Sequence, residues 1–483
     1  MKSSGLAKNN GVAIPVLSLF SGAGGLDNGF FMNHKFDVSF ALDQNYAAGC
    51  TYSMNHGFNI ARIENEKALM QRTFALVDIK NVNMRQLNFF HPSIVIGGPP
   101  CQDFSMIRGP DSERRGIDEA RGRLYAYFVK ALINLNPHFF VFENVPGLAF
   151  QDKRAAFRII KGDFTNLTSK VEKIEEITGN GFTGTPIGYE LLFSRVTDAS
   201  AFGVAQKRQR LVIIGARKDI FNISTKQLEL IKKAVDDSLN PKNSLFAKFP
   251  LSAIEVFEGR TIPELADTYA EIVTEWKSNF LNYKSRFARW IKEKGKTFSG
   301  NILDDYLVSN RIVTLSRAEL DKAWREHRRI LNELGYYNRP LSEDLDFNDD
   351  SNKIPYETKS VKERMENIPP GENYSFVDGT RFKVRGNDIS LVYRRLHPLK
   401  PSYTILARGG GGTHGYHYLR SRSALTNRER ARLQSFPDSF KFSGTLNEQR
   451  MQIGEAVPPL LGKAISDVLS DLYEQLSLEI INA

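Results

Sequence analysis

Ile-Gly-Gly-Pro-Pro-Cys-Gln-Asp-Phe-Ser, residues 96–105, is the stretch around which the chain is organised. It follows the short apolar run 93–96, which predicts a buried strand that ends in a sharp turn. Two glycines let the backbone turn and approach a ligand closely, and two prolines then stiffen the turn. Cys101, one of two cysteines in 483 residues, lies at the end of this turn. A thiol held in this way indicates a positioned nucleophile, but a lone cysteine is more often a small buried hydrophobe, so both interpretations stay open at this point.

Length and composition limit the classes of protein to consider. A chain of 483 residues exceeds what one core usually supports, so we expect two or more domains. Its formal net charge of +10 favours an anionic partner, nucleic acid first, with a basic protein that lacks such a partner as the alternative. The low cysteine count, the absence of a signal-peptide pattern and the lack of a membrane-length apolar run predict a cytoplasmic protein without membrane association. Cys50 is expected to be a buried structural residue.

Three further apolar runs end in residues typical of a nucleotide-type cofactor site. Run 12–20 leads into the glycine-rich turn 21–25 and a helix start, whereas runs 38–42 and 74–77 are followed by Asp43 and Asp78. One carboxylate can accept both hydroxyls of a ribose, and the other can bond the exocyclic amine of adenine. Each acid alone is more often an N-cap or turn residue. In series, these strand ends predict an open α/β sheet that binds an adenosine-containing ligand at its carboxyl edge.

The apolar run 139–142 predicts another buried strand, and it ends in Glu143. We expect the Glu143 carboxyl to be partly desolvated, with a raised pKa, so that it can hold or take up a proton near neutral pH. A surface acid in an Asn/Pro/Gly turn is the alternative. The Arg- and Gly-rich segment 106–120 predicts a mobile loop beside the site, with an ordinary surface loop as the alternative.

Gln206, Arg208 and Arg210 alternate just before the apolar run 211–216. In an extended strand such side chains share one face, and planar donors on one face suit the recognition of phosphate or carboxylate.

Six motifs, in the family's order, resemble those of the DNA cytosine-5 methyltransferases, in particular the bacterial enzymes of restriction–modification systems. They are residues 19–25, 99–102, 143–145, 206–210, 425–438 and 452–459. The resemblance covers about residues 16–216 and 391 to the end. One departure is Glu455, where the family usually has Asn.

The resemblance implies an α/β fold, with a Rossmann-like S-adenosylmethionine-dependent methyltransferase sheet and a second, smaller target-recognition domain. The cofactor-binding and catalytic domain is expected at residues 1–218 and the target-recognition domain at 219–424. Residues 425–483 are expected to carry C-terminal motifs that return to the catalytic domain. The implied protein is a monomer of the bacterial cytoplasm that methylates double-stranded DNA and protects host DNA from a cognate restriction endonuclease.

The resemblance also implies a mechanism. The Cys101 thiolate attacks C6 of a flipped-out cytosine, Glu143 holds N3 and the exocyclic amine and supplies a proton at N3, and Arg208 positions the base and its sugar-phosphate. C5 then takes the methyl group of S-adenosyl-L-methionine, which leaves S-adenosyl-L-homocysteine and 5-methylcytosine. Substrate positioning is expected from Gln102, Ser105, Gln206 and Arg210. No metal is expected. The cofactor is expected to lie along Phe20, Gly22, Gly24, Gly25, Leu26, Asp43, Asp78, Ile79, Pro100, Glu455 and Val457.

The middle of the chain predicts helices more clearly than recognition residues. Capping boxes at 261–264 and 316–319 start two helices, the second of which ends near Gly335. On the first, a helically spaced apolar stripe favours core packing over a base-stacking platform; its residues are Val273, Trp276, Phe280, Tyr283, Phe287 and Trp290. The acidic segment 342–351 predicts a loop, and residues 460–478 predict a last helix.

Two rival functions stay open. One is an RNA (tRNA) cytosine-5 methyltransferase, against which the large basic insert and the missing Cys-Phe-Thr signature argue. The other is a catalytically inactive DNA-binding relative, against which the presence of Cys101 and Glu143 argues. Methylation of exocyclic amines is disfavoured, because such enzymes have Asp/Asn-Pro-Pro-Tyr/Phe where this chain has Pro-Pro-Cys.

Overall fold

The computed structural model describes most of the chain as two compact units. The described residues are 13–62, 71–100, 124–149, 154–179, 182, 186–220, 223–278, 290, 292–293, 298–313, 316–384, 392–408, 412–413, 415–422 and 424–482. The first unit contains residues 1–198, 209–243 and 461–483, and the second contains residues 199–208 and 244–460. The predicted domain boundaries differ from these units, because 219–243 joins the first unit and 425–460 joins the second. Each unit is described by itself.

The first unit is built on an eight-stranded sheet of mixed direction, in the order β3-β4-β2-β1-β5-β6-β8-β7. Strands β1 to β6 pair in parallel, whereas β8 runs antiparallel to both β6 and β7. The predicted α/β class is therefore confirmed. The strands are β1 Ile14–Leu19, β2 Phe36–Asp43, β3 Asn59–Ala61, β4 Thr73–Leu76, β5 Ile94–Gly97, β6 Phe139–Asn144, β7 Tyr189–Asp198 and β8 Gln209–Arg217.

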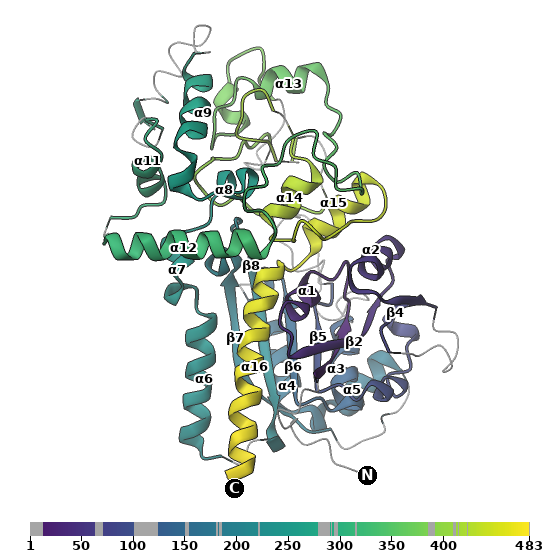
Figure 1. The fold of residues 1–483 in the computed structure, drawn as a ribbon. Helices are drawn as coiled ribbons and strands as arrows, with labels where there is room; N and C mark the ends of the chain where they lie inside the picture. Colours follow the sequence, from purple (N-terminus) through teal and green to yellow (C-terminus); the bar gives the residue numbers. More distant parts are fainter. Residues whose placement is uncertain are drawn as a thin grey trace. The chain divides into compact units, whose positions relative to one another are not determined.

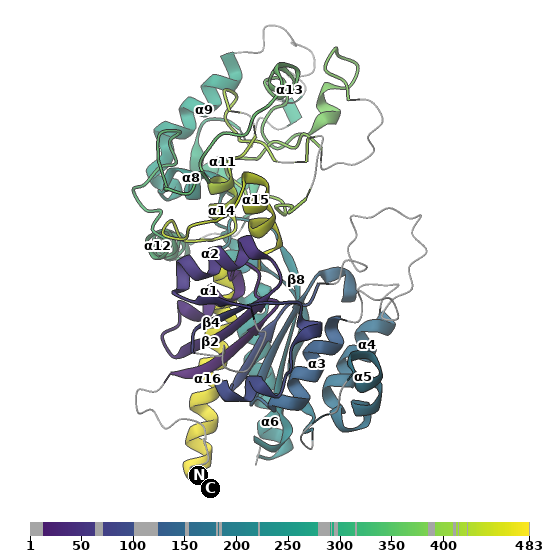
Figure 2. The same cartoon turned by 90° about the vertical axis from the view of Figure 1, so that its right-hand side faces the viewer.

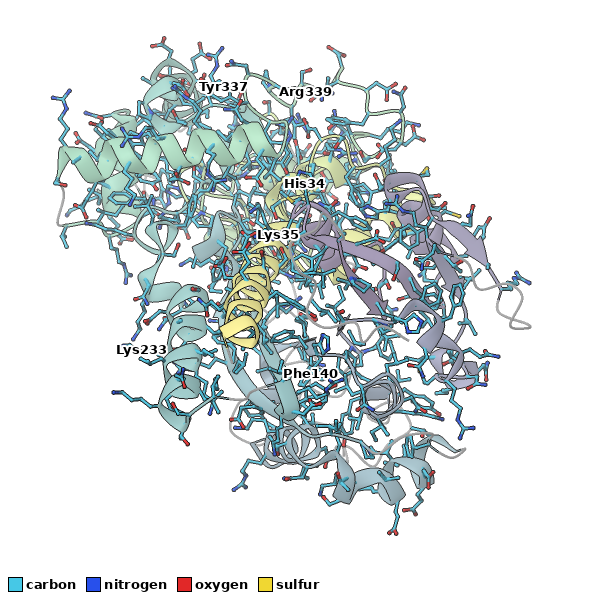
Figure 3. All side chains as sticks on the ribbon, turned by 60° about the horizontal axis from the view of Figure 1, so that its bottom comes forward. His34, Lys35, Phe140, Lys233, Tyr337 and Arg339 are labelled. Atoms are coloured by element: carbon cyan, nitrogen blue, oxygen red, sulfur yellow. The ribbon has the colours of Figure 1, made fainter. Side chains whose placement is uncertain are left out.

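Helices cover both faces of this sheet, which explains why its central strands are apolar runs without alternation. Phe140 and Phe142 of β6 pack on Phe128 of α3 (Leu124–Leu135), with ring centroids 6.1 and 5.4 Å away. Phe139 points to the opposite face, where its ring lies 5.0 Å from that of Tyr473 in α16 (Pro459–Asn482). Figure 2 shows α3 and α16 on opposite sides of the strands, and Figure 3 shows Phe140 among the side chains of the sheet.

The first unit has five more α-helices among its described residues. They are α1 Gly25–Phe31, α2 Tyr46–His56, α4 Arg154–Thr165, α5 Val171–Thr178 and α6 Thr225–Leu239. Residues 461–482 of α16, drawn in yellow in Figure 1, belong to this unit. There α16 crosses α1 at two glycines: a Cβ on Gly29 would lie 2.2 Å from the backbone nitrogen of Lys463, and a Cβ on Gly462 would lie 2.6 Å from the Leu26 carbonyl oxygen. Cys50, in α2, is a half-buried free thiol rather than a buried one.

Among its described residues, the second unit contains helices and irregular segments, and its only β-structure is a few isolated β-bridges. Both predicted capping boxes are present, at Thr261 and at Ser316. Within the predicted apolar stripe, Val273, Trp276 and Trp290 are buried, as core packing requires, whereas its other three residues lie outside the described residues. The helices are α7 Leu245–Lys248, α8 Ala253–Glu258, α9 Ala266–Ser278, α11 Ile302–Ser309, α12 Arg317–Glu333, α13 Lys359–Met365, α14 Asn427–Leu433 and α15 Leu446–Glu455.

A buried arginine organises the loops of the second unit. Arg395 is 1% exposed and donates hydrogen bonds to five backbone carbonyl oxygens, those of Met365, Ile368, His417, Leu419 and Arg422. Burial lowers the pKa of Arg395 to about 9. These bonds satisfy carbonyl groups that irregular backbone would otherwise leave without a partner in the interior.

Two kinds of feature are absent from the described residues. No helix among them has both the length and the apolar character needed to cross a membrane. No cluster of three or more His, Cys, Asp or Glu side chains within the described ranges is arranged to hold a metal ion.

Candidate active site

The functional side chains gather at the carboxyl edge of the parallel strands. Strands β1 and β5 lie side by side, with Leu19 opposite Gly97, yet the chain continues from β1 to β2 on the other side. Strand order reverses at this point, which is where open α/β sheets bind their ligands. The glycine-rich turn after β1 and the Gly-Gly-Pro-Pro turn after β5 therefore emerge next to each other.

The turn after β1 has a backbone shaped to receive a ligand. Phe20, Gly22 and Gly24 have positive φ angles of 56°, 53° and 85°, and such a conformation is uncommon for a phenylalanine. A Cβ built on Gly22 meets no atom within 4 Å, so this turn borders open space. The Gly22 N–H donates to the Asp43 carboxylate at 2.9 Å, which ties the turn to the end of β2. A half-buried turn of backbone that borders open space at Gly22, beside a carboxylate, fits the adenosine and methionine parts of S-adenosylmethionine.

The predicted cofactor residues of the first unit differ in exposure. Asp43 is half-buried, and burial raises its pKa while hydrogen bonds from the backbone of Asn45 and Gly22 oppose the rise. Asp78 caps a short 3-10 helix by accepting a hydrogen bond from the Lys80 N–H. This is the N-cap role that the sequence offered as the alternative to cofactor binding. Gly25 and Leu26 begin α1 and are buried, and Ile79 is 3% exposed within the core.

Glu143 lies against the turn that carries the cysteine. A Cβ on Gly98 would lie 2.6 Å from Glu143 Oε2, so only glycine lets this carboxylate approach the turn so closely. Asn144, the next residue, donates from Nδ2 to the Pro99 carbonyl oxygen at 3.1 Å. The end of β6 thereby fixes the position of Pro99, two residues before Cys101. Pro100 is the last described residue of the turn and is exposed.

Arg210 pairs with Glu143. Strand β8 runs antiparallel to β6 with Val212 opposite Glu143, so Arg210 reaches the same edge of the sheet. Its Nε lies 2.8 Å from Glu143 Oε1, and the two side chains are only 12% and 11% exposed. Burial lowers the pKa of Arg210, and the Glu143 carboxylate opposes that shift. The guanidinium in turn holds the Glu143 carboxyl group in place at this edge of the sheet.

The prediction that Gln206, Arg208 and Arg210 share one face is wrong. Strand β8 begins only at Gln209, and the two earlier residues belong to the second unit. Arg208 is fully buried and donates to the carbonyl oxygens of Ile405, Gly454 and Ala456. Gln206 is also fully buried; it donates to Gln434 and accepts from the Ile405 N–H. Both side chains hold backbone segments together, which gives them a structural role; the base-positioning role of Arg208 and the substrate-positioning role of Gln206 stay predictions.

Some predicted site residues lie outside the described residues, and others belong to the second unit. Cys101, Gln102 and Ser105, and the loop expected at 106–120, lie outside the described residues. Glu455 and Val457 belong to the second unit; Glu455 Oε1 is 4.0 Å from Arg408 Nε, with both side chains exposed, and Val457 is buried.

Residues missed from the sequence also shape the site. Asn144 follows Glu143 in the 143–145 motif, which places it at the site, but nothing in the sequence indicates its hydrogen bond to the Pro99 carbonyl oxygen. Gly98 belongs to the quoted turn, but its closeness to Glu143 depends on the pairing of β5 with β6. Tyr52 and Asp27, which hold the glycine turn from behind, gave no signal, because their contact joins two helices.

Comparisons with known proteins agree with this geometry. The model of the C-5 cytosine-specific DNA methylase family matches residues 14–471. The chain is 46% identical over 462 residues to the DNA (cytosine-5-)-methyltransferase M.ApeKI of Aeropyrum pernix, covering 95% of this chain and 98% of that protein. It is 29% identical to the type II methyltransferase M.NgoFVII of Neisseria gonorrhoeae, over 96% of this chain and 89% of that protein.

A solved structure supports the fold alone. The crystal structure of a prophage-encoded protein of E. coli aligns with a TM-score of 0.53 at 22% identity, covering 96% of this chain and 100% of that chain. With the sheet, the glycine turn and the Glu143–Arg210 pair in place, these matches show that the chain belongs to the C-5 cytosine-specific DNA methylases and transfers the methyl group of S-adenosylmethionine to C5 of cytosine in DNA.

Proposed function

We propose that Cys101 is the nucleophile of this reaction and that the Glu143–Arg210 pair holds the target cytosine beside it. The observation that carries the proposal is the convergence of three groups at one edge of the sheet. Glu143 and Arg210 form an ion pair at 2.8 Å, and Asn144 anchors the Pro99 carbonyl oxygen at 3.1 Å. Pro99 and Pro100, whose φ angles are fixed by their rings, stiffen the backbone directly before Cys101 in the sequence.

The roles follow from the chemistry of cytosine. Its C5 is a poor nucleophile, but addition of the Cys101 thiolate to C6 turns the C5–C6 bond into an enamine whose C5 can take a methyl group. Charge that develops at N3 during this addition needs a proton, and Glu143 is the carboxyl group that would hold N3 and the exocyclic amine. Departure of the C5 proton and of the thiolate restores the aromatic ring as 5-methylcytosine.

Arg210 takes the role first given to Arg208. Its guanidinium has donors beyond the one that it directs at Glu143, and it is 12% exposed at the edge of the sheet. We assign it to orient the Glu143 carboxylate and to contact the base or the adjoining phosphate. Arg208 has its donors on three backbone carbonyls instead.

The glycine turn and the ends of β2 and β4 would hold the cofactor. Gly22 offers open backbone and Asp43 a carboxylate, Phe20 and Gly24 shape the turn, and Asp78 lies next along the edge. Bound S-adenosylmethionine supplies the methyl group. These residues would hold and orient it beside the Gly-Gly-Pro-Pro turn.

The assignment to a biological system rests on the relatives. Because M.NgoFVII is a type II methyltransferase, we assign this chain to a restriction–modification system with a cognate endonuclease. We also propose a monomer that reads double-stranded DNA with its second unit, in the cytoplasm. If the purified protein elutes at the mass of a dimer, the proposed monomeric state is wrong.

A covalent trap tests the proposed roles. Duplex DNA in which the target cytosine is 5-fluorocytosine cannot lose a proton from C5, so the enzyme should remain attached through sulfur when S-adenosylmethionine is present. We expect a stable complex with the wild type, none with Cys101→Ala, and a rate reduced about 100-fold with Arg210→Met. A complex that survives Cys101→Ala would overturn the assignment of the nucleophile.

The tRNA alternative has its own test. Labelled methyl incorporation into duplex DNA and into tRNA should favour DNA, and labelling of tRNA alone would refute the DNA assignment.

A further inference from the structure

Behind the glycine turn, α1 and α2 are joined by a buried hydrogen bond that the reaction mechanism does not use. The Tyr52 hydroxyl of α2 donates to Asp27 Oδ1 of α1 at 2.8 Å. Tyr52 is 0% exposed and Asp27 is 1% exposed, so neither group can exchange this bond for water without opening the core. A buried carboxylate and a buried phenol are costly to place inside a protein unless they are bonded to each other.

The ring of Tyr52 also sets the position of the glycine turn directly. A Cβ on Gly24 would lie 2.8 Å from Tyr52 Cδ2, so the Gly24 backbone is in close contact with the ring. Gly24 is the N-cap of α1, with φ 85° and ψ 29°. The ring is held in turn by its aromatic neighbours, with centroids 5.0 Å from Phe58 and 5.1 Å from Phe74. The surface on which Gly24 rests is therefore rigid.

A chain of hydroxyl groups extends this contact to the other side of the turn. Ser18 of β1, 1% exposed, is hydrogen-bonded to the Asp27 carboxylate. Ser21, in the turn, donates from its hydroxyl to Ser18 Oγ at 2.9 Å and accepts from the Leu42 N–H at 3.0 Å. Asp27 thus connects Tyr52 on one side with Ser18 and Ser21 on the other. The turn between Ser21 and Gly24 is held at both of its ends.

We propose that Tyr52 and Asp27 form a buried clamp that holds the glycine turn in the shape that S-adenosylmethionine requires, and that both are positioning residues for methyl transfer. The clamp rests on the proposed placement of the cofactor at this turn. Phe20 adopts a left-handed backbone that is unfavourable on its own, and Ser21 and Gly22 follow it immediately. Without the clamp the turn would relax, and cofactor binding would have to restore its shape. The free energy needed to restore the shape of the turn should weaken cofactor binding and leave the rate of the chemical step unchanged.

The experiment measures the dissociation constants of S-adenosylmethionine and S-adenosylhomocysteine by calorimetry on the full chain, together with kcat and both KM values. The test variant is Tyr52→Phe, which removes one hydroxyl and keeps the ring. The matched control is Tyr189→Phe: Tyr189 is also 0% exposed in the first unit, and it donates to the Pro137 carbonyl oxygen at 2.9 Å at the other end of the strands. Both variants lose one buried hydrogen bond, so a general loss of stability affects both alike.

For Tyr52→Phe we expect both dissociation constants and the KM for S-adenosylmethionine to rise about fivefold, the equivalent of one hydrogen bond. The value of kcat at saturation and the KM for DNA should change less than about twofold, and Tyr189→Phe should leave all of these constants near wild type. Asp27→Asn keeps an acceptor for the Tyr52 hydroxyl and should preserve affinity, whereas Asp27→Leu should weaken it as Tyr52→Phe does.

Two results would overturn the clamp. One is a Tyr52→Phe protein that binds both ligands within about twofold of wild type, and the other is an equal loss of affinity in Tyr189→Phe. Asp43→Asn separates the clamp from the placement of the cofactor. If that variant weakens binding while Tyr52→Phe does not, the clamp alone is wrong; if neither weakens binding, the placement at the turn is wrong as well.

Discussion

The ion pair between Arg210 and Glu143 should couple strongly, because it is nearly closed to water. Its Nε–Oε1 distance is 2.8 Å, with side chains 12% and 11% exposed. Two unit charges at that distance attract by about 6 kcal/mol at an effective dielectric constant of 20, before desolvation is subtracted. Desolvation opposes the attraction, and it is the largest influence on the pKa of Arg210. We therefore expect a net coupling energy of about 2–3 kcal/mol.

The assay is a double-mutant cycle with Arg210→Met, Glu143→Gln and the double variant. Hydrogen exchange of peptides from β6 and β8 gives the opening free energy of this region for each protein, so the coupling is measured locally in a chain with two units. The matched control is the pair of Lys353 and Asp350, which has the same 2.8 Å separation but side chains 63% and 64% exposed. Its coupling energy should be about 0.5 kcal/mol or less.

The reasoning fails if the two cycles return the same coupling energy, since burial would then have no effect on the pair. It also fails if Arg210→Met leaves kcat/KM unchanged, because the proposed role of Arg210 predicts a loss of about 100-fold.

Three further predictions concern stability. Gly29→Ala should lower the free energy of unfolding by about 3 kcal/mol or more, because its Cβ would lie 2.2 Å from the backbone nitrogen of Lys463. The control is Gly162→Ala in α4, where a Cβ meets nothing within 4 Å. In thermal melts this control should be neutral or stabilising. Burial raises the pKa of Asp27 from 3.8 to about 6, so its contribution to stability is complete below pH 4 and is lost as the pH rises to 6. Urea denaturation should show the wild type losing about 3 kcal/mol relative to Asp27→Asn across that range, and a constant difference would refute the burial argument. Arg208→Met should reduce the melting temperature sharply without a selective rise in the KM for DNA; a selective rise would restore the role first predicted for this residue.

Much of the sheet could be predicted because its strands are buried on both faces. Runs 74–77 and 139–142 contain no polar residue and run 38–42 contains one, and they are followed by Asp78, Glu143 and Asp43. The same logic placed Asp43 and Glu143 at one edge, since parallel strands share the direction of their carboxyl ends. Edge strand β3 has three residues, too few for a pattern, and β7 mixes buried with half-exposed positions; neither was predicted.

The partners of the arginines could not be predicted, because they depend on distant segments. Arg208 reaches carbonyl oxygens 197 to 248 residues away, and backbone carbonyls leave no mark in a sequence. Arg210 meets Glu143 only because β8 enters the sheet antiparallel to β6. Alternation in a sequence predicts a shared face only inside a strand, and β8 starts after Arg208. The clamp of Tyr52 and Asp27 depends likewise on the packing of two helices.

The most direct test of the account is the identity of the methylated base. Duplex DNA is incubated with the protein and S-adenosylmethionine that carries a trideuterated methyl group, then digested to nucleosides and analysed by mass spectrometry. The account predicts that the label appears in 5-methylcytosine and that Cys101→Ala abolishes it. Label in N4-methylcytosine or N6-methyladenine, or label that persists without Cys101, would contradict the account.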